Sequence, residues 1–287
     1  MKTRFLVVFL VALLGFQQCG RSDHADKPTI AIVMKTLNNP FFIDMQEGAQ
    51  AAAKTLGVEL VVQAPEREVD VEKQMQIIEN LIQRKVSAIC VAPSGSKEIV
   101  PAILKANQAK IPVIAIDTRV DKNALAESGA VVISFIGSDN EDGGRIAGEF
   151  VSEKLGGTGK VAILEGIPGH ETGDARLRGF REALDKHKGM SIVASQTANW
   201  ERDQGFNVFR NILQAHPDVK AIFACNDMMA LGAVEAIAAG GRKGKIVVVG
   251  FDAIKDSRVA IMNGDMHASI AQHPEEMGRL AVETAFK

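Results

Sequence analysis

Residues 34–42 read Met-Lys-Thr-Leu-Asn-Asn-Pro-Phe-Phe and follow an apolar run, at a point where a strand should turn into a helix. A plain connection would use small or polar residues, not two amides, a proline and two adjacent aromatic rings. Amide and charged side chains can bond sugar hydroxyls, because each hydroxyl both donates and accepts a hydrogen bond. Aromatic rings can cover the apolar C–H faces of a sugar. The stretch therefore holds both kinds of group that a polyol-binding site requires.

Side chains of the same kinds occur after other apolar runs along the chain. Those suited to the hydroxyls or to the ring faces are Lys35, Asn39, Asp117, Arg176, Asn226, Asp252 and Gln272, with Phe42 and Trp200 for the faces. Each also has an ordinary structural explanation: Asp252 and Asn226 could cap helices, Arg176 could be solvated, and Phe41 could be core although Phe42 is not. The prediction of a site depends on all of them lying at one edge of the fold.

The motifs of common enzymes and cofactor sites are not found in the sequence. The segment 156–160 (Gly-Gly-Thr-Gly-Lys) fails the spacing of a phosphate loop, and a strand is expected after it where a helix should follow. No GxSxG elbow is present, and the six histidines lack metal-site spacing. Nothing favours a glycosidase pair of carboxylates. We therefore expect a binding protein that is not an enzyme and has no cofactor or metal.

The elements that would position these residues alternate between strands and helices. Several strand candidates are apolar on consecutive positions, which is typical of parallel sheets covered on both faces. The segment 71–84 has helical period. This order predicts an α/β fold with parallel sheets, whose ligands bind at the carboxyl ends of the strands. The strand candidates are 29–33, 58–62, 88–92, 113–116, 131–136, 160–164, 191–194, 221–224, 245–249 and 267–270.

About ten strands are too many for one ordinary sheet, so we expect two similar lobes. The best boundary is the segment 136–140, where a strand ends and Asp139 or Asn140 could cap the next helix. Glycines at 143, 144 and 148 indicate close backbone packing near the start of that helix. The predicted lobes are residues 28–137 with 273–287, and residues 138–272.

The first residues are typical of a secretory signal. Lys2 and Arg4 precede an apolar run over 5–14, which is too short to span a membrane. We predict a signal over 1–19 and a tether over 20–27, and hence export to the periplasm or cell envelope. Lipid attachment at Cys19 stays open as an alternative to simple cleavage, because Gln18 stands where lipoproteins have a small residue. Cys90 and Cys225 are expected to be buried thiols and not a disulfide.

The charge balance excludes some partners. The formal net charge is −2 and no basic cluster occurs, so no global field draws the chain to nucleic acid or anionic lipid.

From about residue 29 to 286 the chain resembles the periplasmic sugar-binding proteins of the ribose and allose type, the substrate receptors of ABC importers. The segments that carry the resemblance include 35–42, 116–119, 137–140, 175–180, 194–200, 215–227 and 248–252. It implies the type I periplasmic binding protein fold, with two Rossmann-like lobes and a hinge. It also implies a monosaccharide ligand, a permease in the inner membrane and a monomer. The implied ligand residues are Lys35, Asn39, Phe41, Phe42, Asp117, Arg176, Trp200, Asn226 and Asp252, with Gln272 at the hinge.

Departures from the ribose receptors suggest a different sugar. Ribose receptors have a serine where Lys35 stands, and an arginine directly after the residue that matches Asp117, whereas here Arg119 comes one place later. Lys35 and Trp200 look more like the allose and psicose receptors. We therefore expect an allose- or psicose-like hexose in preference to ribose. His170 is expected not to reach the ligand.

Two further expectations follow from the resemblance. Family members continue past the segment 275–286 into a final strand and a third crossing, whereas this chain stops at Lys287, so we expect a less protected N-terminal lobe in hydrogen exchange. A sensor that presents its closed form to a chemoreceptor or histidine kinase stays open as an alternative to a transport receptor. A repressor with this fold would need a DNA-binding helix pair where the signal stands.

Overall fold

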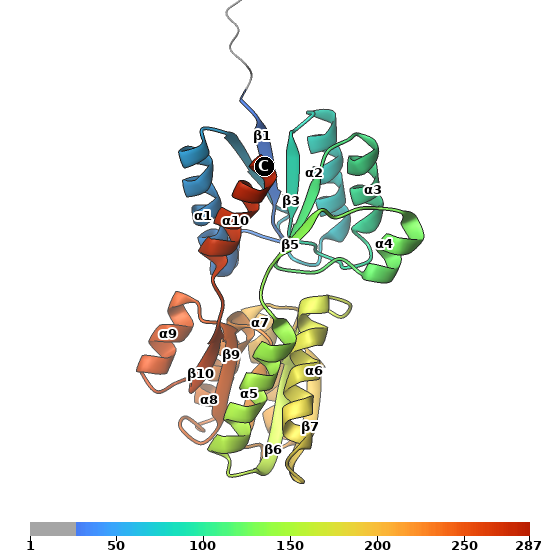
Figure 1. Ribbon diagram of the computed structural model, residues 1–287. Helices are drawn as coiled ribbons and strands as arrows, with labels where there is room; N and C mark the ends of the chain where they lie inside the picture. Colours follow the sequence, from blue (N-terminus) through green and yellow to red (C-terminus); the bar gives the residue numbers. More distant parts are fainter. Residues whose placement is uncertain (1–26) are drawn as a thin grey trace, which may run out of the picture.

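The computed structural model describes residues 27–287, which form two lobes, each with a five-stranded parallel sheet (Figure 1). The first sheet has the order β2-β1-β3-β4-β5. Its strands are β1 (Thr29–Val33), β2 (Glu59–Gln63), β3 (Ala88–Val91), β4 (Val113–Ile116) and β5 (Ser134–Ile136). The helices of this lobe are α1 (Pro40–Leu56), α2 (Val71–Gln83), α3 (Val100–Gln108), α4 (Lys122–Ser128) and α10 (Pro274–Phe286), which packs beside α1.

The second sheet has the order β10-β9-β8-β6-β7. Its strands are β6 (Thr158–Glu165), β7 (Gly189–Thr197), β8 (Ala221–Ala224), β9 (Val247–Asp252) and β10 (Ala268–Ala271). Its helices are α5 (Asn140–Lys154), α6 (Glu171–Asp185), α7 (Arg202–Ala215), α8 (Asp227–Ala239) and α9 (Lys255–Met262).

The predicted α/β fold is confirmed, and all ten predicted strands are found. The ends of β1, β4 and β8 are as predicted, and those of the other strands differ. The strand predicted over 131–136 covers only Ser134–Ile136, because Val131 and Ile133 lie exposed at the edge of the sheet. Strand β7 is longer than predicted. Its parallel pairing with β6 continues into polar sequence that an apolar pattern does not mark.

The carboxyl ends of the strands in one sheet face the carboxyl ends of the strands in the other. Strand β5 leads into α5 across residues 137–139, and β10 leads into α10 across residues 272 and 273. Both strands therefore run toward the opposite lobe (Figure 1). Because all pairings within each sheet are parallel, the other strand ends point into the same space between the lobes. This is where open α/β sheets bind ligands.

Helices α5 and α6 touch backbone to backbone, which confirms the close packing predicted from the glycines near residue 143. A Cβ added at Gly144 would lie 2.1 Å from the carbonyl oxygen of Arg176, and one added at Gly179 would lie 1.9 Å from that of Glu141. The position of α6, and with it of Arg176, therefore depends on these two glycines.

Replacing Gly144 by alanine should lower the free energy of unfolding by about 1–3 kcal/mol, because the added methyl must push α6 away from α5. Urea denaturation measures this as a lower midpoint. Glu149→Ala on the exposed side of the same helix is the control and should change the midpoint little. An unchanged midpoint in Gly144→Ala would mean that α6 moves at no cost.

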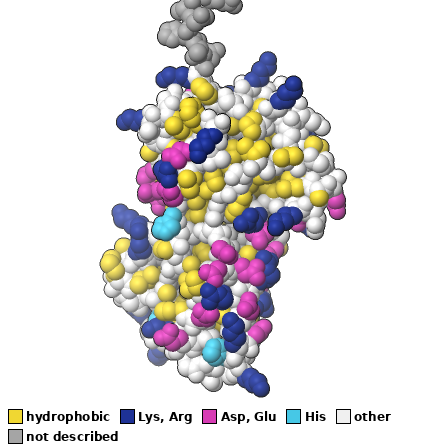
Figure 2. All heavy atoms as spheres, viewed as in Figure 1, with side chains coloured by type: hydrophobic (Ala, Val, Ile, Leu, Met, Phe, Trp, Pro, Cys, Tyr) yellow, Lys and Arg dark blue, Asp and Glu magenta, His cyan; other side chains and the backbone are white. Residues whose placement is uncertain are grey.

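Two smaller expectations can be compared with the described residues, namely the state of the cysteines and the distribution of charge. Cys90 and Cys225 are free and buried, as predicted. On the face in Figure 2, acidic and basic side chains are mixed over the lower lobe, so this part of the surface has no extended area of one charge sign. Among residues 27–287, none of the helices has the length and apolarity that a membrane span requires. The predicted signal and Cys19 lie outside the described residues.

Candidate functional site

A small cavity lies where the carboxyl ends of the two sheets meet. Its volume is about 20 Å³, which holds about one water molecule, so the two lobes are closed upon each other. Nine of the ten predicted site residues line it, and Gln272 does not. The lining residues are Lys35, Asn39, Phe41, Phe42, Glu68, Asp117, Thr172, Arg176, Trp200, Asn226 and Asp252.

The loop before α1 brings Asn39 and the two phenylalanines to the cavity. Asn39 caps α1, because its Oδ1 accepts a hydrogen bond of 3.1 Å from the N–H of Phe41. Pro40 is the first residue of the helix, the position at which proline is favoured. Phe41 and Phe42 form an edge-to-face pair with centroids 5.2 Å apart. Both are buried, so the alternative in which only Phe41 is buried is wrong.

Lys35 and Asp117 form a buried ion pair on the first lobe. The Lys35 Nζ lies 2.8 Å from Asp117 Oδ2, and both side chains are about 95% buried. Thr118 Oγ1 donates a hydrogen bond of 3.0 Å to the same oxygen. Burial alone would raise the pKa of Asp117, but the charge and hydrogen bond of Lys35, with Arg176 and Thr118, outweigh it and lower this pKa. The carboxylate is therefore ionised and fixed in place.

Arg176 on α6 is held by backbone and amide acceptors, so the alternative of a solvated side chain is wrong. Its Nε donates to Asn140 Oδ1 at 2.9 Å, and its Nη1 donates to the carbonyl oxygen of Cys225 at 2.6 Å. The guanidinium carbon lies 3.7 Å from the centre of the Phe251 ring. Nη1 is also 3.7 Å from Asp252 Oδ1, which is an ion pair without a short hydrogen bond.

Asp252 ends β9 and is not a helix cap, because α9 begins at Lys255 and its cap is Ile254. The Nε2 of Gln272 donates a hydrogen bond of 2.7 Å to Asp252 Oδ1. Burial raises the pKa of Asp252, and Arg176 opposes this rise. An ionised Asp252 is thus disfavoured in the closed structure until further donors reach it.

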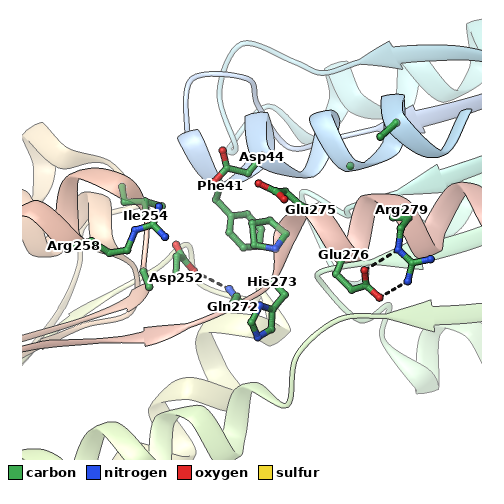
Figure 3. Close-up of a pocket in the computed structure, with 14 residues that line it drawn as sticks. Phe41, Asp44, Asp252, Ile254, Arg258, Gln272, His273, Glu275, Glu276 and Arg279 are labelled. Carbon is green, nitrogen blue, oxygen red and sulfur yellow. Dashed lines mark hydrogen bonds and ion pairs between the residues drawn. The ribbon is translucent and has the colours of Figure 1, made fainter. Parts of the chain in front are cut away.

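Gln272 lies at the hinge beside a second, larger cavity. This cavity has a volume of about 440 Å³ and is shared by α1, the hinge and the start of α10 (Figure 3). Asp252 and Phe41 line both cavities, so the two are neighbours. The Oε1 of Gln272 is buried without a hydrogen-bond partner. Gln272 therefore contacts the smaller cavity only indirectly, through its hydrogen bond to Asp252.

Asn226 and Trp200 come from the second lobe. Asn226 caps α8, as one interpretation of the sequence proposed, because its Oδ1 accepts from the N–H of Met229 at 2.9 Å. Its Nδ2 also donates to the carbonyl oxygen of Trp200 at 3.1 Å. The indole ring lies against Gly166, where a Cβ would come within 1.9 Å of it. Only a glycine leaves room for the ring at this place.

Three of the lining residues have strained backbones. Asp117, Trp200 and Asp252 have φ angles of 59°, 68° and 113°, which residues with a Cβ rarely adopt. Such conformations cost on the order of 1–3 kcal/mol each and gather at functional sites. All three strained residues therefore lie where their side chains line the cleft.

Two lining residues, Glu68 and Thr172, were not predicted from the sequence. Glu68 follows β2, and the rule that ligands bind after strands could have pointed to it. Burial raises the pKa of Glu68 to about 7, and Lys35 opposes the rise. Thr172 lies with its Oγ1 3.4 Å from that of Thr118 in the other lobe. Arg119 does not reach the cleft, because its guanidinium stacks on Phe135 at 3.9 Å.

The arrangement suits the binding of a polyol. The cleft offers charged and amide groups from both lobes together with three aromatic rings. Among residues 27–287, no group of three or more potential ligands that could hold a metal ion is present.

Comparison with known proteins places the chain among sugar-binding proteins. The sequence model described as "Periplasmic binding protein domain" matches residues 30–287. The ribose import binding protein of Escherichia coli K12 is 42% identical over 278 residues, which are 97% of this chain and 90% of that protein. The D-allose-binding periplasmic protein of the same organism is 39% identical and covers 86% of this chain and 80% of its own length.

A solved structure has the same architecture. The periplasmic solute binding protein of an ABC transporter from Actinobacillus succinogenes 130z, solved with bound D-allose, matches with a TM-score of 0.86 and 42% identity. The match covers 91% of each chain.

Proposed function

The chain belongs to the periplasmic binding protein family, and on this premise we propose that it is the substrate-binding protein of an ABC-type importer of a monosaccharide. The family consists of solute-binding proteins and not of enzymes. The observation that carries the proposal is the cleft itself, in which polar and aromatic groups from two lobes converge on one space.

The proposed mechanism is closure around the sugar. The open form admits the ligand, and each lobe contributes part of the site, so the sugar favours the closed form. Asp117 and Lys35 would bond hydroxyls from one side, and Arg176, Asn226 and Asp252 from the other. Gln272 Oε1, which is buried at the hinge without a partner, would accept a bond from a further hydroxyl. Phe42 and Trp200 would cover the ring faces.

The proposed ligand is an allose- or psicose-like hexose, with ribose as the competing sugar. Relatives named for ribose and for allose are similar in identity, so the proposal rests on Lys35 and Trp200. Lys35 is a buried donor already paired with Asp117. A sugar whose hydroxyls leave these groups unpaired would lose affinity, because a buried polar group without a partner is costly.

The partner and location follow from the family. Proteins of this family that serve ABC importers are exported to the periplasm. Because an importer includes a membrane permease, the proposed partner of this chain is such a permease. We propose that the chain acts as a monomer and presents its closed form to that permease. Attachment of a lipid at Cys19 is proposed as an alternative to simple cleavage of the signal. Mass spectrometry of the exported chain would reveal the mass of the lipid.

Tryptophan fluorescence provides the first test, because Trp200 is the single tryptophan and lines the cleft. Emission of the exported chain should change saturably with D-allose or D-psicose, and more weakly with D-ribose. Trp200→Phe should lose the signal, so binding to that variant is followed by calorimetry. Absence of both heat and fluorescence change with a panel of monosaccharides, in a folded protein, would refute the proposed function.

A further inference from the structure

His170 connects the two lobes at the side of the cleft. It precedes α6 in the second lobe and is 1% exposed. Its Nε2 lies 2.5 Å from the carbonyl oxygen of Ser94, in the loop after β3 of the first lobe. Its Nδ1 lies 3.2 Å from Nε1 of Trp200. One imidazole thus bridges the opposite lobe and the aromatic ring that faces the sugar site.

The two partners fix the protonation state of the ring. A carbonyl oxygen can only accept, so Nε2 must carry the proton. The indole N–H can only donate, so Nδ1 must be without one. The structure therefore requires a neutral imidazole with its hydrogen on Nε2. A doubly protonated ring would set its Nδ1–H against the N–H of Trp200.

The neighbouring residues make the same connection between lobes. The backbone N–H of Glu171 donates to Ser96 Oγ at 3.1 Å, and Thr172 approaches Thr118. Three consecutive residues at the start of α6 therefore touch the first lobe. These contacts exist only while the lobes are closed, because Ser94, Ser96 and Thr118 all belong to the other lobe.

We infer that His170 is a positioning residue for sugar binding: it ties the indole of Trp200 to the Ser94 carbonyl across the cleft, so that this wall of the site is fixed when the lobes close. The inference rests on the proposed function for the role of Trp200. His170 itself does not line the cavity, in agreement with the sequence-based expectation. It acts through the indole and through closure.

Closure should consequently weaken in acid. Burial and the Lys35 ammonium lower the pKa of His170 to about 3 in the closed structure, while the Ser94 carbonyl and Asp117 act in the opposite direction. In an open cleft the pKa should approach the ordinary value of about 6.5. The contribution of His170 is therefore complete above pH 6.5 and is lost as the pH falls toward 3. At pH 5.5 the affinity should fall by a factor of about ten.

Other titrating groups near the cleft must be separated from His170. The charged side chains that act on it are Lys35 and Asp117, both from the first lobe. The first turn of α6, which His170 precedes, also carries the acidic residues Glu171 and Asp174. Glu68 works in the opposite direction, because its raised pKa means that protonation favours the closed form. A comparison of variants that all retain these groups removes their contribution.

The test compares the wild type with His170→Gln and His170→Phe, by calorimetric titration with D-allose at pH 7.5, 6.5 and 5.5. Phenylalanine fills the space without polar atoms, so the Kd of His170→Phe for D-allose should be at least tenfold higher than that of the wild type at pH 7.5. Glutamine offers a donor and an acceptor but does not titrate, so its loss should be smaller. The ratio of the wild-type Kd to the His170→Gln Kd should rise about tenfold between pH 7.5 and 5.5.

The outcomes separate this inference from the proposed function. If the wild type binds D-allose, D-psicose or D-ribose and both variants bind equally well at every pH, the inference is wrong and the function stands. If the wild type binds none of them, the proposed function fails and the inference, which rests on it, fails with it. The bridge is also judged directly by ¹⁵N NMR of the imidazole in the sugar-bound chain. A tautomer with its proton on Nε2 that persists below pH 5 supports the bridge, and ordinary titration near pH 6.5 overturns it.

Discussion

Replacing Asp252 by alanine should raise the Kd for D-allose at least a hundredfold. The carboxylate is buried at the end of β9, beside Arg176 and Gln272, and it would accept hydrogen bonds from sugar hydroxyls. Bonds to an ionised acceptor are the stronger ones, and truncation also leaves the buried guanidinium with one partner fewer. Calorimetric titration at pH 7.5 gives the Kd of both proteins directly.

The controls for this variant separate binding from folding. Asp252→Asn keeps the shape and one acceptor oxygen, so its loss should be smaller than that of the alanine variant. Asp256→Ala removes an exposed carboxylate on the following helix and should leave the Kd unchanged. Binding by Asp252→Ala within a factor of three of the wild type would remove Asp252 from the proposed site.

Asp252→Asn should also stabilise the unliganded protein in alkaline solution. Burial raises the pKa of Asp252 above its value in the unfolded chain, so ionisation favours unfolding. The stability contributed by the protonated group is present below the unfolded value near 4 and is lost as the pH rises through the folded value. The melting temperature of Asp252→Asn should therefore exceed that of the wild type more at pH 8.5 than at pH 4.5. Thermal melts at pH 8.5 and pH 4.5 measure this difference. If Arg176 lowered the pKa of Asp252 more than burial raises it, the advantage of Asp252→Asn would be smaller at pH 8.5 than at pH 4.5.

The sequence predicted most of the fold because strands buried on both faces are apolar at consecutive positions. Strand β4 is Val-Ile-Ala-Ile and β8 is Ala-Ile-Phe-Ala, and every residue of both is buried. Both strands were placed with the correct ends. Strands at or near sheet edges were placed less well, since their ends are polar or exposed, as in β7 and β5.

The site could be predicted where its residues directly follow strands or match family segments. Asp117, Asn226 and Asp252 fall into this class. Glu68 was missed because its loop follows β2 at an edge of the sheet and carries no motif. The polar contacts of His170 depend on closure of the lobes, since Ser94 lies 76 residues away in the chain. No local pattern encodes a contact that forms only between two separately folded halves.

The strained backbones and the unpaired buried acceptor support the conclusion that the cleft binds a ligand. Asp117, Trp200 and Asp252 occupy conformations that cost stability, and Gln272 Oε1 is buried without a partner. A chain under selection for stability alone would relax these features. They become favourable when a ligand supplies donors and acceptors in the cleft, because the cost is then offset by the bonds formed.

The buried pair of Lys35 and Asp117 should be strongly coupled. Lys35→Met keeps the length of the side chain but leaves a buried carboxylate without its counterion, which should lower the free energy of unfolding by about 3 kcal/mol. Asp117→Asn alone leaves a buried ammonium and should also destabilise the protein. The double variant carries neither charge, so it should recover much of the stability. Urea denaturation of the four proteins gives the coupling energy.

The same double variant separates stability from function, because the two charges that stabilise each other are also the proposed partners of the sugar hydroxyls. It should therefore be folded and yet bind D-allose at least a hundredfold more weakly than the wild type. The exposed pair of Lys105 and Glu79 provides the control, since its removal should change neither the midpoint nor the Kd. Strictly additive effects at Lys35 and Asp117 would show that water or another group replaces the missing partner. Normal binding by the double variant would mean that the sugar is held by the second lobe and the aromatic rings alone.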